Sequence, residues 1–114
     1  MKYCPLTTQI LNENELKIEY KSSREIGVVR LGEKHLYFRK LRKIYYIPYG
    51  DIEKCFRRVI TVPMKLCCGK GDMGIEHLVI CGRDGELAQI ELPGTKAARI
   101  LMEQLKDRIP DREV

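Results

Sequence analysis

Apolar and polar residues alternate along most of the chain, in short runs that turn residues separate. A period of two is typical of half-buried β-strands, because successive side chains of a strand point to opposite faces of the sheet. The pattern predicts about seven strands, most of them joined by tight turns. They are expected at residues 15–21, 26–31, 35–38, 44–47, 52–62, 77–81 and 87–92.

The first of these segments, residues 15–21, admits two interpretations. Leu16, Ile18 and Tyr20 alternate with charged residues, which favours a strand. The alternative is a short helix that Asn12 opens, with Glu15 completing a capping box. In a helix the three apolar side chains would point to different faces, so the strand is preferred.

Turn residues mark the connections between the predicted strands. Gly32 and Gly50 fall in the turns expected at 32–34 and 48–51, and Asp84-Gly85 is a strong signal for a hairpin. The strand at 52–62 is long enough to contain a β-bulge. Residues 63–75 contain three glycines and two adjacent cysteines, and we expect a loop there.

The period of the pattern changes after Pro93-Gly94. Thr95 is a good helix N-cap, and Pro110 is expected to end the helix. We therefore predict one amphipathic helix over residues 95–109. Its apolar stripe is formed by Ala97, Ala98, Leu101, Met102, Leu105 and Ile109.

These elements predict a mainly β fold with one C-terminal helix. The chain has 114 residues, the size of a single domain, and we expect one domain over 1–114 with a core at about 15–109. Hairpin-connected strands of this number curl or split into two packed layers. A helix with one apolar stripe buries that stripe against an open end or face of the sheets.

Composition narrows the class of protein further. The chain is 44% hydrophobic and 32% charged, which is the balance of a globular protein and not of a disordered one. No apolar run approaches the roughly 20 residues that span a bilayer, and no signal peptide is evident. We expect a soluble, cytoplasmic protein. Five cysteines without an export signal then indicate free thiols: Cys4, Cys55, Cys67, Cys68 and Cys81.

Two stretches carry a resemblance to a known family. The run GEKHLYFRK, continued by KIYYIPYGDIEKC, leads from an exposed turn through an aromatic strand to a proline corner. The run ELPGTKAARILMEQLKDRI turns a last strand directly into a helix. Together they resemble the pleckstrin-homology-like (PH-like) superfold, closest to bacterial PH-like and GRAM-like domains. The resemblance implies a bent barrel of about seven antiparallel strands in two sheets, with the C-terminal helix as its cap. The chain lacks the tryptophan usual in the helix of eukaryotic PH domains.

The densest charge in the chain lies between two predicted strands. Four of five consecutive positions are basic, namely Arg39, Lys40, Arg42 and Lys43. Lys34, Lys40 and Arg42 resemble the spacing by which some PH domains hold inositol phosphates, although here the residues fall one hairpin later. The net charge of +5 favours acidic partners. Three interpretations remain open: a solvated hairpin turn, a phosphate or anionic-lipid site, or a site for an acidic protein.

Other candidate chemistry is weaker. Cys67, Cys68, His77 and Cys81 are zinc-ligand types, but adjacent cysteines chelate poorly, and i and i+4 of a strand lie roughly 13 Å apart. Buried thiols explain Cys55 and Cys81 better. The segment CGKGDMG lacks the spacing of a nucleotide-binding loop. No metal or cofactor is therefore expected.

Catalysis and nucleic-acid binding are also disfavoured. The two histidines lie on predicted strands and the only serines, Ser22 and Ser23, lie in a polar connection, so no nucleophile–base pair is indicated. The aromatic residues that alternate with Lys and Arg suit stacking on single strands, but strands with one buried face show the same alternation. They are Tyr37, Phe38, Tyr45 and Tyr46.

The expected function is that of a non-catalytic PH-like interaction module. Its partner is expected to be a protein or peptide, bound at an exposed strand edge or in the groove beside the helix. The alternative is peripheral attachment to anionic lipid or phosphoinositide through the basic hairpin. For that alternative the candidate residues are Lys34, Arg39, Lys40, Arg42 and Lys43.

Overall fold

A computed structural model describes residues 2–7, 11–63 and 72–109. Eight strands, two α-helices and one 3-10 turn lie within these residues. In chain order they are β1 (Lys2–Pro5), α1 (Glu13–Ser22), β2 (Arg24–Ile26), β3 (Val29–Leu31), β4 (His35–Lys40), β5 (Lys43–Pro48), the 3-10 turn Tyr49–Asp51, β6 (Lys54–Pro63), β7 (Asp72–Gly82), β8 (Gly85–Glu91) and α2 (Thr95–Arg108).

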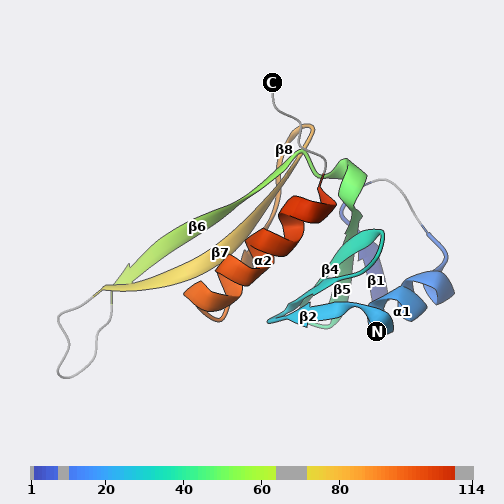
Figure 1. Cartoon of the computed structure of the whole chain (residues 1–114), viewed down its shortest axis with the longest axis horizontal. Helices are drawn as coiled ribbons and strands as arrows, with labels where there is room; N and C mark the ends of the chain where they lie inside the picture. Colours follow the sequence, from blue (N-terminus) through green and yellow to red (C-terminus); the bar gives the residue numbers. More distant parts are fainter. Residues whose placement is uncertain (1, 8–10, 64–71, 110–114) are drawn as a thin grey trace.

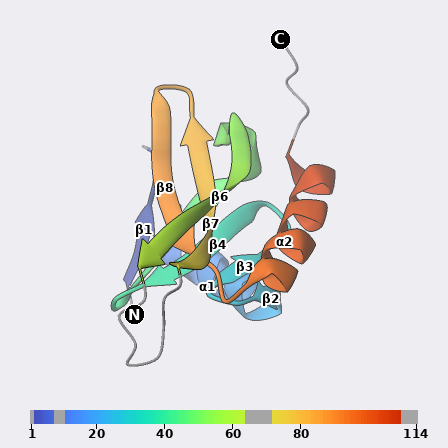
Figure 2. The same ribbon diagram turned by 90° about the vertical axis from the view of Figure 1, so that its left-hand side faces the viewer.

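The strands form two sheets. Sheet A has the order β1-β5-β4-β3-β2, and sheet B has the order β6-β7-β8. The mainly β class, the two sheets and the C-terminal helix are therefore as predicted. The closed barrel is wrong, because across the described residues each sheet ends in two separate edge strands. In Figure 1, β6 and β7 extend beyond α2, and in Figure 2, α2 stands beside β6.

The main core lies where sheet A, sheet B and α2 meet. Alternation along β4 directs Leu36 and Phe38 into it, and both side chains are almost fully buried. Sheet B contributes Leu78 and Ile80 from β7. The apolar stripe of α2 covers them with Ala98, Leu101 and Leu105, each at most 2% exposed.

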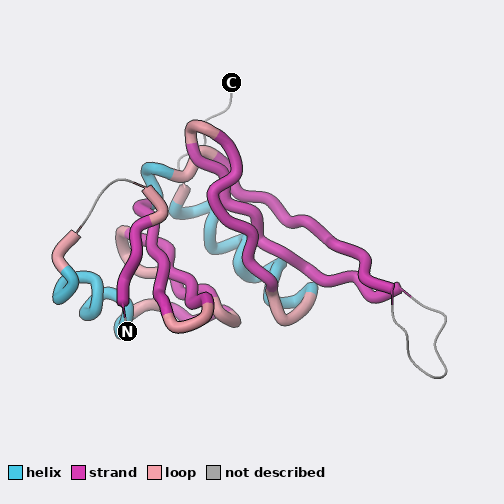
Figure 3. Tube along the Cα trace, turned by 180° about the vertical axis from the view of Figure 1, so that it is seen from behind, coloured by secondary structure: helices cyan, strands magenta, loops and turns pink. Residues whose placement is uncertain are grey.

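The opposite face of sheet A is covered by α1, as Figures 1 and 3 both show. The strand predicted at 15–21 is therefore wrong. Asn12 caps the helix, since its side-chain oxygen accepts a hydrogen bond from Asn14 N at 2.8 Å. Only Leu16 among the residues of α1 is buried, while Ile18 is 70% exposed. The alternation of Leu16, Ile18 and Tyr20 reflects a helix that buries a narrow stripe.

Pairing within sheet A also departs from the sequence prediction. Residues 26–31 do not form one strand, because the chain reverses at Gly27, whose φ is +62°, and β2 pairs with β3. Residues 2–5, where no strand is predicted from the sequence, form β1, which runs parallel to β5. A parallel neighbour so far away in the sequence leaves no signal in local periodicity.

The structure corrects three predictions for the C-terminal half of the chain. The N-cap of α2 is Gly94, because the hydroxyl of Thr95 donates instead to Glu76 Oε1 at 3.4 Å. The register shift falls between Ile80 and Cys81 on β7, not in the segment 52–62. The predicted loop at 63–75 is shorter, since β7 begins at Asp72, and residues 64–71 lie outside the described residues. None of the helices in the described part of the chain is long and apolar enough to cross a membrane.

Candidate functional site

The turn between β4 and β5 is the most unusual surface feature of sheet A. The two strands pair from His35 with Pro48 to Lys40 with Lys43, which leaves Leu41 and Arg42 as a two-residue turn. Such turns need a positive φ to match the twist of their strands, and glycine or asparagine normally provides it. Here Leu41 adopts a φ of +59°, and its side chain is 86% exposed.

The four predicted cations surround this leucine. All four side chains are exposed, and within residues 2–7, 11–63 and 72–109 none of them forms an ion pair. Because side chains alternate along a strand, Arg39 shares the α1 face of the sheet with Ile44, while Lys40 and Lys43 share the other face. The cations therefore lie on both faces of the turn.

A second turn lies at the same end of sheet A. The β2–β3 turn is formed by Gly27 and Val28, and Val28 O accepts a hydrogen bond from Arg39 N at 3.2 Å. The side chain of Val28 is 46% exposed. Parallel pairing with Lys43 brings the exposed Lys2 to this end as well. We call this surface the basic end of sheet A; it comprises Lys2, Val28, Arg39, Lys40, Leu41, Arg42 and Lys43.

Three members of the basic end were not predicted. Lys2 belongs to it through the parallel pairing of β1, which no local pattern signals. Val28 was assigned to the middle of a strand and not to a turn. The sequence does mark Leu41 as unusual. It is a large apolar residue inside a run of four cations at a hairpin, a position that suits neither a core residue nor an ordinary solvated one.

Lys34 lies apart from the other predicted cations. It belongs to the β3–β4 turn and lies six positions before Lys40 at the end of β4, which is roughly 20 Å along a strand. Its backbone N–H donates to Glu19 Oε2 at 2.7 Å. The structure therefore does not bring Lys34 into the basic end.

Glu19 of α1 organises that opposite end. Its Oε1 accepts hydrogen bonds from His35 Nδ1, at 2.7 Å, and from the Tyr37 hydroxyl. Burial by itself raises the pKa of Glu19, but the hydrogen bonds from Tyr37, Lys34 N–H and His35 together hold it below its usual value. Burial and the neighbouring carboxylate raise the pKa of Tyr37. Through these hydrogen bonds the Glu19 carboxylate links α1 to sheet A.

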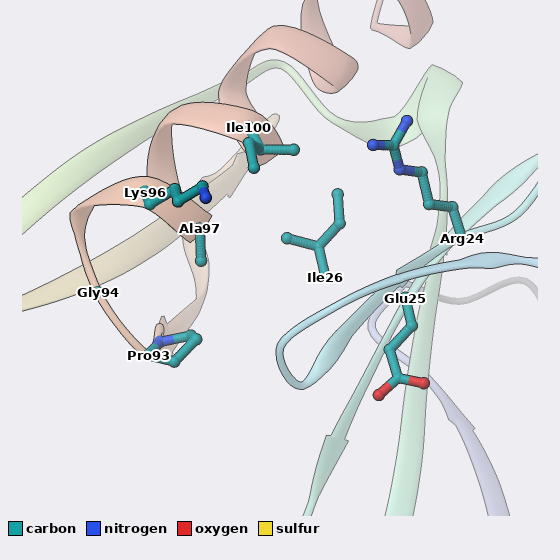
Figure 4. Close-up of a pocket in the computed structure, with 8 residues that line it drawn as sticks. All are labelled: Arg24, Glu25, Ile26, Pro93, Gly94, Lys96, Ala97 and Ile100. Atoms are coloured by element: carbon teal, nitrogen blue, oxygen red, sulfur yellow. The ribbon is translucent and has the colours of Figure 1, made fainter.

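A groove lies beside α2, between the N-terminal half of that helix and the edge strand β2 (Figure 4). Its volume is about 410 Å³. Ala97 and Ile100 of α2 face Ile26 of β2 across it, and the cationic residues Arg24 and Lys96 line its rim. The groove is apolar at its centre, and its edge contains these two cations and the carboxylate of Glu25.

The remaining residues that the sequence suggested as functional lie in the core or outside the residues that the structure describes. Burial, and after it the neighbouring Cys81, raises the pKa of Cys55 to about 12, so its thiol is a poor nucleophile. Among the described residues no three metal-ligand side chains come together, and Cys67 and Cys68 lie outside these residues. The predicted aromatic set is mainly core: Tyr37, Phe38 and Tyr46 are at most 4% exposed, and Tyr45 is half-buried against Phe38.

Comparison of the chain with protein-family models, with curated proteins and with solved structures gives no match. The geometry of the described residues is therefore what bears on function.

Proposed function

We propose that the basic end of sheet A attaches this protein to an anionic lipid surface. The observation that carries the proposal is Leu41, a leucine with positive φ that is 86% exposed among unpaired cations. A left-handed conformation costs a residue with a Cβ about 1–2 kcal/mol. Folding gains nothing from the side chain in return, because it contacts solvent. Burial in another phase supplies the missing gain, about 1.5–3 kcal/mol for a leucine.

The charges fit the same surface. A Lys or Arg close to an anionic leaflet contributes about 1 kcal/mol. The five cations of the basic end all lie around the exposed apolar tips, Val28 and Leu41. Stable attachment usually requires two signals, an apolar insertion and a polybasic patch, because each alone is too weak. The basic end combines both within two hairpin turns.

Vesicle co-sedimentation tests the proposal. The protein is expected to bind vesicles that contain phosphatidylserine, to bind pure phosphatidylcholine vesicles far less, and to dissociate as salt is added. Replacing Arg39, Lys40, Arg42 and Lys43 with Ala should abolish this binding. The matched control replaces four exposed cations elsewhere, namely Arg83, Lys96, Arg99 and Lys106, and removes the same net charge.

Two outcomes contradict this proposal. Equal loss of binding in the two quadruple variants would show that net charge, and not the basic end, attracts the vesicle. Full competition by soluble inositol hexakisphosphate, with no contribution from Leu41, would point to a phosphate site instead of a membrane surface.

A second candidate function is the recognition of a peptide in the groove beside α2. The favouring observation is the combination of an apolar centre, a rim with two cations and one carboxylate, and the adjacent edge strand β2, which suits an extended peptide with an apolar residue between charged ones. Selection from a displayed peptide library, with Ala97→Arg as counter-selection, tests it. No enrichment over the counter-selected protein would exclude this groove. The two sheets and C-terminal helix support the PH-like relationship, which we propose together with either function.

A further inference from the structure

A second cavity, of about 370 Å³, lies between α1 and the β3–β4 turn. One face of the helix lines it with residues spaced i, i+3, i+4 and i+7, namely Glu15, Ile18, Glu19 and Ser22. Leu11 and Leu16 add apolar surface, and Glu33, Lys34 and His35 form the opposite wall. The cavity is at the end of sheet A opposite the basic end, so nothing in the membrane proposal accounts for it.

His35 is the polar group at the base of this cavity. The residue is only 9% exposed, and its Nδ1 is held 2.7 Å from Glu19 Oε1. Hydrogen bonds keep Glu19 ionised at neutral pH, so Nδ1 carries a proton and donates it to the carboxylate. In the neutral imidazole Nε2 is then a bare acceptor. Positioning of a histidine by a carboxylate in this way is how proteins fix the tautomer they use.

The Nε2 atom has no hydrogen-bond partner within the part of the chain that the structure describes. No buried polar side-chain atom in that part is left without a partner either. Nε2 therefore keeps some contact with solvent, and His35 is one of the residues that line the cavity. An acceptor at the base of a cavity selects ligands that carry an N–H or O–H donor.

Charge selects among those donors. Glu15, Glu19 and Glu33 all line the cavity, whereas Lys34 is the single lining cation. Three carboxylates, two of them exposed and one partly buried, around this acceptor favour a positively charged donor. The walls favour an alkyl group, since Ile18 is 70% exposed at the opening and Leu16 is buried beside it.

We propose that this cavity binds a small aliphatic primary amine in its cationic form. The ammonium group donates a hydrogen bond to His35 Nε2 and lies between the carboxylates of Glu15 and Glu33. The alkyl chain covers Leu11, Leu16 and the exposed face of Ile18. Glu19 lines the cavity as well, and its hydrogen bond with Nδ1 fixes the orientation of His35.

The test uses three six-carbon probes that differ only in the head group: hexylamine, hexanol and hexanoate, each added to the intact protein at a fixed pH of 8. Nitrogen NMR of the histidine side chains reports the Nε2 resonance of His35. Hexylamine should shift this resonance in a saturable way and hexanol more weakly. Hexanoate should leave it unchanged, and His77 serves as the internal control since its Nδ1 is bound to Ile75 O at 2.9 Å.

Charge variants on exposed positions keep the test independent of folding. Ile18→Lys and Glu33→Lys should each weaken hexylamine binding by about two- to fivefold, and Ile18→Glu should strengthen it by a similar factor. Glu103→Lys, on the exposed face of α2, makes the same charge change as Glu33→Lys but outside the cavity, and it should have no effect.

Four results would overturn the proposal. A larger shift with hexanoate than with hexylamine would show that His35 presents a donor and that the cavity takes an anion. A shift that does not saturate, or one that Ile18→Lys leaves unchanged, would place the amine elsewhere. A hexylamine effect equal to that of hexanol would show that the positive charge, and so the carboxylates around the cavity, plays no role.

Discussion

Two turns at the same end of sheet A each have a residue with positive φ at their first position, but one turn uses glycine and the other uses leucine. Both are two-residue connections between antiparallel strands, and both need a positive φ at their first position. The β2–β3 turn uses Gly27, which has a φ of +62°, and the β4–β5 turn uses Leu41, which has a φ of +59°. Glycine adopts this positive φ without strain because it has no Cβ, whereas leucine does not.

The surroundings of the two residues explain the difference. A Cβ built on Gly27 would lie 2.9 Å from Cδ of Pro93, so the close approach to the start of α2 also excludes a side chain. Leu41 has no such neighbour and projects into solvent. The first turn is specified by folding alone. The second departs from what folding prefers, and such departures are expected where a residue serves binding.

Placing a side chain in the glycine turn should have the largest effect on stability. Gly27→Leu introduces the left-handed strain and a clash with Pro93, and we expect the free energy of unfolding to fall by about 3 kcal/mol or more. Denaturant unfolding monitored by circular dichroism measures it. Val28→Leu, one residue further along the same turn, is the control and should change stability little. Equal stability of the Gly27→Leu protein would mean that the two turns are not distinguished by packing.

The third turn of sheet A, at the opposite end, extends the comparison. A Cβ on Gly32 would lie 2.7 Å from Cγ of Glu19, although the glycine has no positive φ. Gly32→Ala should therefore displace the Glu19 carboxylate and break its hydrogen bonds, at a cost of about 1–3 kcal/mol. Denaturant unfolding of Gly32→Ala, Glu19→Gln and the double variant measures it. Full additivity of the two single changes would contradict a shared cause.

The same carboxylate sets an acid dependence. Hydrogen bonds hold the pKa of Glu19 below its unfolded value, so its contribution to stability is present above about pH 4.5 and is lost as the pH falls further. Between about pH 5 and pH 3 the wild type should lose stability more steeply than Glu19→Gln. Thermal unfolding across that range is the measurement. Parallel curves for the two proteins would show that Glu19 is not held in its ionised form.

Much of the fold was predictable from the sequence, but the basic end was predictable only in part. The hairpins at 35–47 and 77–92 follow from alternation, and α2 follows from its apolar stripe and proline stop. The helix at 13–22 was missed because one buried residue, Leu16, gives too narrow a stripe to distinguish a helix from a strand. The cations were found as a run of charge, but the sequence does not show that β1 adds Lys2 or that Lys34 lies at the far end.

The variant with the smallest expected effect on stability tests the comparison between the two turns most directly. Leu41→Gly removes the strain of a positive φ, and we expect the protein to become more stable by about 0.5–1 kcal/mol, after the higher chain entropy of glycine is subtracted. The same change should weaken binding to phosphatidylserine vesicles by about tenfold or more, because the inserted side chain is lost. Denaturant unfolding and vesicle co-sedimentation on one preparation measure both quantities.

Val59→Thr is the control for that pair of measurements, because Val59 is also exposed, at 55%, but lies on β6 away from the basic end. It should leave vesicle binding unchanged. A Leu41→Gly protein that gains stability and still binds vesicles as the wild type does would mean that the leucine has no role at the lipid surface. A loss of both stability and binding would mean instead that the turn itself needs the leucine. Only stability gained together with binding lost supports the view that the two turns differ because one of them meets a membrane.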